Sequence, residues 1–156
     1  IRNEKYDSVK DLHNKIKNKI KNFDIVIHSA AVSDFELNNK KKSKIKSTED
    51  LHLELAPTTK IFEKLKNMNE KIFLVGFKAE FNVSSKDLIN RAYDLLKSAN
   101  ADIVVANDVG KKNAGFDVDT NEVYIIDKNK KVQHIGLSEK RSVADRLLDN
   151  IADKIK

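Results

Sequence analysis

The sequence predicts a three-layer α/β fold with a Rossmann-like, doubly wound, mostly parallel sheet and an antiparallel hairpin near the C-terminus. Apolar runs of strand length alternate with segments of helical periodicity over residues 8–106, which is typical of parallel strands joined by helices. Two further strand-like runs then flank a short polar turn. The chain of 156 residues has neither a linker nor an internal repeat, which indicates one domain over residues 1–156.

The first predicted unit is a helix followed by a strand. Apolar residues recur at helical spacing between residues 8 and 22, and Ser8 or Asp7 is placed to cap the first turn. Apolar residues then occupy positions 25–27 in succession, which favours a strand over residues 24–29. Because these residues do not alternate with polar ones, we expect both faces of the strand to be covered.

The next stretch is predicted to be a loop, a strand and a short helix. Residues 36–48 lack periodicity and carry a lysine cluster, so we expect a loop there. Leucines alternate with polar residues over 51–55, as in a half-buried strand. Thr58 or Thr59 then caps a short helix.

Two more strands and a helix complete the parallel part. Residues 71–79 form a buried strand, and Gly76 near its end suggests the close approach of another backbone or a ligand. A helix follows Ser84, with its apolar face between residues 88 and 99. Residues 102–106 are the third buried strand.

The C-terminal part is predicted to be a hairpin and a helix. Residues 122–127 and 132–135 pair around a polar turn. The last helix starts at Ser138 and presents an apolar face to the core. We expect that face to bury Val143, Ala144, Leu147, Leu148, Ile151 and Ile155.

Composition excludes several functional classes. The chain has no cysteine, which removes disulfides, thiol nucleophiles and thiolate metal sites. No apolar run approaches the roughly 18 residues that a membrane span requires, and no signal peptide is present, so we expect a cytoplasmic protein without membrane partners.

The net charge is +6, but only residues 40–46 form a lysine cluster. This pattern fits a nucleotide or another small polyanion better than a nucleic acid.

Small and polar residues at three strand ends form the candidate site. The carboxyl ends of parallel strands meet at one edge of a sheet, where α/β proteins bind their ligands. The residues that we expect there are Ala30, Ala31, Asp34, Gly76, Phe77 and Asn107. The four histidines are scattered and match no metal-binding or nucleophile motif, so no protein metal ligands are predicted.

Six short motifs occur in the order found in phosphopantothenoylcysteine synthetases, also called phosphopantothenate–cysteine ligases. The motifs are SAAVSDF (29–35), KIK (44–46), LAPTTKI (55–61), VGFKAE (75–80), VANDV (105–109) and GFDVDTNEV (115–123). The sequence resembles the archaeal and bacterial type, which is often fused to a flavin-dependent decarboxylase. The resemblance covers nearly the whole chain.

This resemblance implies a ligase of coenzyme A biosynthesis. CTP converts the carboxyl of 4′-phosphopantothenate to an acyl-cytidylate with loss of pyrophosphate, and the amine of cysteine then gives the amide and CMP. Lys44 matches the family's functional lysine, so the resemblance implies that it is the catalytic residue that carries the acyl-cytidylate forward and that it also binds the nucleotide. By resemblance, substrate binding falls to Ala30, Ala31, Asp34 and Asn107, and nucleotide binding to Asp34, Gly76 and Phe77. Mg²⁺ would be held largely by phosphate oxygens. The family also implies a homodimer.

Other interpretations remain open. The family's Gly-rich N-terminal segment has no counterpart here, so we expect a domain truncated at its N-terminus, which is incomplete as an enzyme by itself. Tyr93 and Lys97 have the spacing of the proton-transfer pair in NAD(P)-dependent short-chain dehydrogenases and nucleotide-sugar epimerases, although helix periodicity favours a surface pair. A non-catalytic nucleotide-binding module is a third possibility. The residues alone do not distinguish CTP from ATP.

Overall fold

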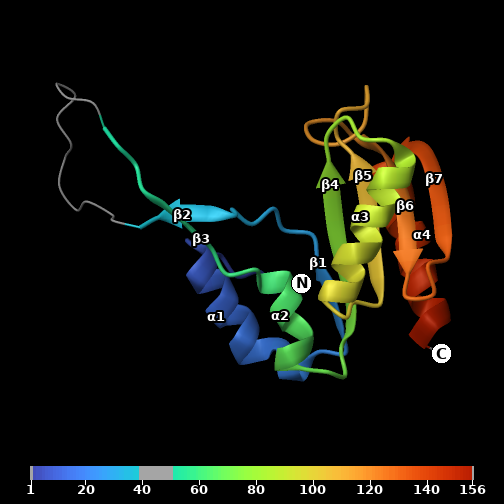
Figure 1. Cartoon of the computed structure of the whole chain (residues 1–156). Helices are drawn as coiled ribbons and strands as arrows, with labels where there is room; N and C mark the ends of the chain where they lie inside the picture. The colour runs from blue at the N-terminus through green and yellow to red at the C-terminus, as the bar shows by residue number, and fades with distance from the viewer. Residues whose placement is uncertain (1, 39–50, 156) are drawn as a thin grey trace.

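The computed structural model in Figure 1 describes residues 2–38 and 51–155. Its main sheet has five strands in the order β1-β4-β5-β6-β7. The strands are β1 (Ile25–His28), β4 (Phe73–Glu80), β5 (Ile103–Asp108), β6 (Thr120–Asp127) and β7 (Val132–Glu139). The pairs β1–β4 and β4–β5 are parallel, whereas β5–β6 and β6–β7 are antiparallel. The predicted parallel part and C-terminal hairpin are therefore confirmed.

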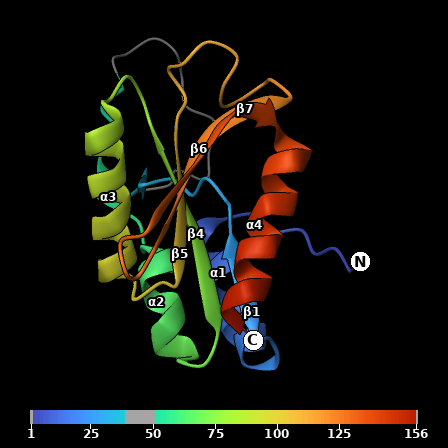
Figure 2. The same cartoon turned by 90° about the vertical axis from the view of Figure 1, so that its right-hand side faces the viewer.

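Helices cover both faces of this sheet, which gives the predicted three-layer α/β fold. One layer contains α1 (Val9–Lys19), α2 (Ile61–Met68) and α3 (Ser85–Ser98), and α4 (Lys140–Ile155) packs on the other face. Figure 2 shows α3 and α4 on opposite sides of the strands. No helix in the described ranges is both long enough and apolar enough to span a membrane.

Among the first three α-helices, α1 and α3 start at a local capping signal and α2 does not. Ser8 caps α1 by accepting a hydrogen bond from the backbone of Asp11, and Ser84 caps α3 in the same way. Helix α2 instead has Lys60 at its N-cap position, without a side-chain cap. The prediction that Thr58 or Thr59 caps α2 is therefore wrong, because Thr58 bonds to another segment, as described below.

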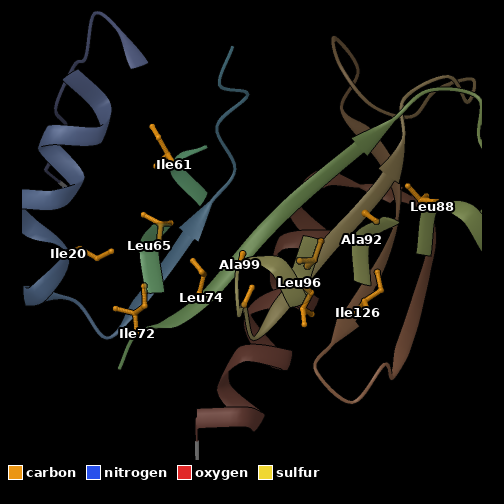
Figure 3. Packing of buried hydrophobic residues seen from close by; sticks show 13 residues of the cluster. Ile20, Ile61, Leu65, Ile72, Leu74, Leu88, Ala92, Leu96, Ala99 and Ile126 are labelled. Atoms are coloured by element: carbon orange, nitrogen blue, oxygen red, sulfur yellow. The ribbon is translucent and has the colours of Figure 1, made fainter. Parts of the chain in front are cut away.

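The core consists of two clusters, one on each face of the sheet. Figure 3 shows the larger cluster, in which Leu65 of α2 and Leu96 of α3 pack towards Leu74 of β4. The other cluster joins β5, β6 and β7 to the inner face of α4. Every residue of β5 is buried, because the strand lies in the middle of the sheet with a cluster on each side.

Strand β1 is less covered than the sequence predicts. Ile25 and Ile27 are 41% and 43% exposed, so the expectation of cover on both faces is wrong. The reason is that β1 is an edge strand whose inner face alone packs against the cluster of α1 and α2. Helix α4 packs on β6 and β7 at the other side of the sheet.

A second, two-stranded sheet forms an arm beside the main sheet. Strand β2 (Phe35–Leu37) pairs antiparallel with β3 (Leu55–Pro57). The expected strand over 51–55 is wrong in extent and burial, because pairing begins at Leu55 and Leu53 is 59% exposed. The predicted loop begins inside β2, and its lysine cluster at 40–46, including Lys44, lies outside the described residues.

The C-terminal helix begins later than predicted. Ser138 belongs to β7, and α4 starts at Lys140. Its inner face buries Val143, Leu147 and Ile151, whereas Ala144, Leu148 and Ile155 are exposed. The apolar stripe of α4 is therefore wider than the surface that the sheet covers.

Candidate functional site

A pocket of about 350 Å³ lies where β1 and β4 end. Most of its lining comes from the turn after β1, the connection from β3 to α2, the first turn of α2 and the end of β4, and Leu95 of α3 also contributes. Its lining includes His28, Ala30, Ala31, Ser33, Asp34, Thr58, Thr59, Lys60, Phe62, Phe77, Lys78 and Ala79. The pocket therefore forms at the carboxyl edge of the parallel strands, where ligands bind in open α/β sheets.

Most of the residues predicted to form a site meet in this pocket. Ala30, Ala31 and Asp34 come from the turn after β1, and Phe77 comes from β4. Gly76 is buried behind the pocket, and a Cβ atom built on it would lie 2.2 Å from Cζ of Phe62. The predicted close approach at Gly76 is therefore made by an aromatic side chain, which separates this glycine from the pocket.

Asn107 is not among the residues that line the pocket. It lies beside Ala79 in the β4–β5 register, and its Nδ2 donates to Oδ1 of Asn121 at 3.3 Å. The neighbouring Asp108 accepts hydrogen bonds from three backbone N–H groups, at Asn82, Val83 and Gly110. The tip of β5 therefore holds neighbouring loops together, one strand away from the pocket wall.

Lys60 is a pocket residue that the sequence interpretation missed. Its Nζ forms an ion pair with Oδ1 of Asp34. The hydrogen bond and the charge of Lys60 hold the pKa of Asp34 below its ordinary value, so the carboxylate is ionised at neutral pH. Both residues belong to motifs noted in the sequence, but nothing in the sequence shows that the two motifs touch.

Thr58 ties the two halves of the pocket wall together. Its backbone N–H donates to the carbonyl of Asp34 at 2.9 Å, and its side-chain hydroxyl donates to the carbonyl of Ser33. Thr58 is only 8% exposed. A buried hydroxyl of this kind needs a hydrogen-bond partner. The Thr58 hydroxyl finds it in the turn before β2 and therefore does not cap α2.

His28 is the last residue of β1 and forms part of the pocket lining. Its ring lies 5.8 Å from the ring of Phe62, centroid to centroid. Within the described residues, its Nε2 is buried and has no hydrogen-bond partner. Burial lowers the pKa of His28, so the imidazole is neutral at pH 7.

The pair Tyr93 and Lys97 lies elsewhere. Nζ of Lys97 is 5.1 Å from the ring centroid of Tyr93 and 3.0 Å from Oδ1 of Asp94. Neither Tyr93 nor Lys97 lines the pocket at β1 and β4. This arrangement agrees with the surface-pair interpretation. The described ranges contain no cluster of three or more His, Cys, Asp or Glu side chains that could hold a metal ion.

Known proteins match the chain over its full length. Residues 1–155 match the family model described as the DNA/pantothenate metabolism flavoprotein C-terminal domain. The coenzyme A biosynthesis bifunctional protein CoaBC of Methanocaldococcus jannaschii is 37% identical over 156 residues, covering 100% of this chain and 38% of the relative. The protein of the same name from Thermococcus kodakarensis is 38% identical over 149 residues, covering 93% and 35%. The chain thus spans less than two fifths of these relatives.

Solved structures share the fold. A DNA/pantothenate metabolism flavoprotein from Streptococcus pneumoniae superposes with a TM-score of 0.83 at 27% identity, covering 97% of this chain and 72% of the other. The C-terminal domain of a CoaBC protein gives 0.74 at 30% identity, covering 96% and 66%. A Cab2 mutant in complex with phosphopantothenate-cysteine gives 0.62 at 16% identity, covering 97% and 54%, and supports the fold alone. The chain belongs to the DNA/pantothenate metabolism flavoprotein C-terminal domain family, and within it to the phosphopantothenoylcysteine synthetase domains.

Proposed function

We propose that the chain is the ligase part of a coenzyme A biosynthesis protein and joins 4′-phosphopantothenate to cysteine. The names of its CoaBC relatives and the six ordered motifs support this role. The observation that carries the proposal is the meeting of Ala30, Ala31, Asp34 and Phe77 in one pocket. These residues come from two motifs that are far apart in the chain. Because the relatives are bifunctional, a fused or associated decarboxylase is the partner that we propose.

The proposed chemistry has two steps. The carboxylate of 4′-phosphopantothenate attacks the α-phosphorus of CTP, and pyrophosphate leaves. The amine nitrogen of cysteine then attacks the acyl carbon, CMP leaves with the bonding electrons, and the amine loses a proton to form the amide. Positioning and charge stabilisation supply most of the catalysis in such transfers. Mg²⁺ would be bound mainly by phosphate oxygens, as this cation usually is.

Each proposed residue has a role that its position in the fold allows. Ala30 and Ala31 have small side chains, which let a ligand approach the backbone of the turn. Asp34 is ionised and can accept hydrogen bonds from ligand hydroxyl groups. Phe77 is 38% exposed and offers an aromatic edge or face to the cytosine. Asn107, in the strand next to the wall, donates one N–H of its amide to Asn121, which leaves its second N–H and its Oδ1 for the substrate.

The test of the function is a coupled assay of both half-reactions. Pyrophosphate release and amide formation are followed with CTP or ATP, 4′-phosphopantothenate and cysteine. The assay compares this chain with a version that also carries the family's Gly-rich N-terminal segment. In the longer version we expect pyrophosphate release with CTP and amide formation only when cysteine is added, whereas this chain alone is expected to form no amide. Nucleotide binding without either product favours the non-catalytic module. No binding of CTP or ATP, together with a rise in melting temperature with NADPH, favours the dehydrogenase interpretation.

Replacing Lys44 with glutamine tests the role that the family resemblance implies. Lys44 lies outside the described residues, and its role rests on the KIK motif. Its charge offsets negative charge on the acyl-cytidylate, so its loss is expected to slow amide formation about 100-fold, which is typical of a lost transition-state donor. Lys40→Gln removes the same charge from the same cluster and is the control. Equal rates for the two variants would contradict a specific role for Lys44.

The arm formed by β2 and β3 is where we propose that a second copy binds. Phe35, Leu37, Leu55 and Leu53 alternate along the two strands and share one face. They are 57%, 38%, 56% and 59% exposed, respectively. Figure 1 shows the arm extending away from the main sheet. A two-stranded ribbon with an uncovered apolar face is marginally stable by itself. The four residues named here carry no charge that would repel an identical face.

A charged residue on the arm is therefore expected to separate the homodimer. Leu53→Lys would place an ammonium group in the interface and halve the molar mass measured by light scattering after gel filtration. Leu137→Lys in β7 is the matched control, since Leu137 is 52% exposed on the main sheet. A dimer that persists in Leu53→Lys, or a native chain that is monomeric at about 50 μM, which lies far above the Kd of a stable dimer, would contradict the proposed interface.

A further inference from the structure

The ion pair between Lys60 and Asp34 crosses the pocket between two segments of the chain. The residues are 26 positions apart, and both side chains line the pocket. Lys60 is the N-cap residue of α2, and Asp34 ends the turn after β1, directly before β2. Their side chains are 54% and 66% exposed, respectively. Ion pairs with this exposure contribute little to stability, so the pair is free to exchange its partners.

The wall of the pocket does not depend on this pair. Thr58 binds the carbonyls of Ser33 and Asp34 through its hydroxyl and its backbone N–H. The β2–β3 ladder begins directly after Asp34. Asp34 therefore keeps its place when Lys60 moves, and Lys60 is anchored by the start of α2. Each charge can turn to a ligand without a change in the backbone.

The charges of the lining select a ligand that carries both an anionic group and hydroxyl groups. Asp34 and Glu63 are balanced by Lys60 and Lys78, and Lys78 also pairs with Glu80 at 3.0 Å. A bare anion would release Lys60 but leave the Asp34 carboxylate facing it. A nucleotide satisfies both, since its phosphate accepts from an ammonium group and its ribose hydroxyls donate to a carboxylate.

Resting on the proposed function, we propose that Lys60 is an exchangeable phosphate-binding residue of this pocket. In the free protein it holds Asp34. When a nucleotide binds, its ammonium group leaves Asp34 for a phosphate oxygen, and Asp34 accepts a hydrogen bond from a ribose hydroxyl. Lys60 thereby contributes to the affinity for the phosphate and not for the nucleoside.

Cytidine and CMP differ only by the phosphate and therefore isolate this contribution. Their dissociation constants are measured by calorimetry on the whole chain. In Lys60→Gln, we expect the CMP constant to rise about tenfold, the size of one lost charge-assisted hydrogen bond, and the cytidine constant to stay within about twofold. Lys60→Arg keeps the charge and is expected to retain most of the affinity for CMP. Asp34→Asn is expected to weaken the binding of cytidine and the binding of CMP by the same factor.

Lys64→Gln is the matched control, because Lys64 is an exposed residue of the same helix that does not line the pocket. It changes the net charge equally and should alter neither constant. The proposal is overturned if Lys60→Gln leaves CMP binding unchanged, or if it weakens the binding of cytidine as much as the binding of CMP. If the native chain binds neither ligand, and a version that carries the family's Gly-rich N-terminal segment makes no amide, the proposed function fails as well. If amide forms while Lys60→Gln has no effect on CMP, only the role of Lys60 fails.

Discussion

Replacing Gly76 with alanine is expected to lower the free energy of unfolding by about 3 kcal/mol, the upper end for overpacking a core. The added Cβ would lie 2.2, 2.6 and 2.8 Å from Cζ, Cε2 and Cε1 of Phe62. These distances are far below van der Waals contact, so the Phe62 ring must move. Since that ring lines the pocket, the space open to it is the pocket itself, and ligand binding should weaken together with stability.

Two measurements and two further variants test the effect of Gly76→Ala. The melting temperature should fall by about 6–12 °C, given about 2–4 °C per kcal/mol for a chain of this size. Gly136→Ala is the control, because a Cβ there has no atom within 4 Å. Phe62→Leu combined with Gly76→Ala shortens the obstructing side chain and should recover part of the stability. A Gly76→Ala protein with native melting temperature and native CTP affinity would contradict the steric account.

Replacing Asp102 with asparagine is expected to lower the free energy of unfolding by about 3–5 kcal/mol at pH 7, as for other broken buried ion pairs. The Asp102 side chain is 9% exposed and accepts three hydrogen bonds. The donors are the backbone N–H of Leu74 and the Nζ atoms of Lys66 and Lys128, each at 2.8 Å. Without the carboxylate, the ammonium group of Lys66, whose side chain is 13% exposed, loses its counter-charge.

The same site gives a pH dependence with a defined sign. Burial raises the pKa of Asp102, but the hydrogen bonds from Lys128, Lys66 and Leu74 together outweigh it and hold the pKa below the ordinary value. A depressed native pKa stabilises the fold above the unfolded pKa of about 3.9, and the contribution is lost as the pH falls through the native pKa. The difference between native protein and Asp102→Asn should therefore be large at pH 7 and shrink below about pH 4.

Urea denaturation at a series of pH values measures this difference. Asp94→Asn is the matched control, because Asp94 is 71% exposed in its pair with Lys97 and should change stability by less than about 1 kcal/mol. A loss for Asp102→Asn no greater than for Asp94→Asn would show that the buried pair does not stabilise the fold. A loss that stays constant between pH 7 and pH 3 would show that the carboxylate charge is not its source.

Local signals in the sequence were reliable wherever one element decides the outcome. Ser8 and Ser84 cap their helices because a cap needs only the hydroxyl and the backbone of the next turn. The hairpin of β6 and β7 also forms where the sequence predicts it, because its two strands are neighbours in the chain and are joined by a short polar turn. Thr58 shows the limit of such signals. Its hydroxyl lies close in sequence to the start of α2 and was expected to cap that helix, but it donates its hydrogen bond to the carbonyl of Ser33 instead.

Burial was predicted less well, because it depends on which other elements pack on a strand or helix, and the apolar pattern of one element does not specify these. The apolar run of β1 reads like that of β5, yet β5 is buried throughout and β1 is half-exposed. The difference lies in position, since β5 is central in the sheet and β1 is at its edge. In the same way, the leucines over 51–55 alternate with polar residues as in a half-buried strand, but Leu53 is exposed on an arm with an uncovered face.

The sequence by itself determined the order of the five main-sheet strands and of the four α-helices, together with the motifs that define the family. Periodicity and motif order are properties of the chain alone. The sequence also identified Ala30, Ala31, Asp34 and Phe77, which meet in the pocket. Only the tertiary structure decided that Asn107 lies one strand away and that Lys60 faces Asp34. The physical reason is that a pattern encodes which residues share a face of one element, whereas packing decides which other element that face meets.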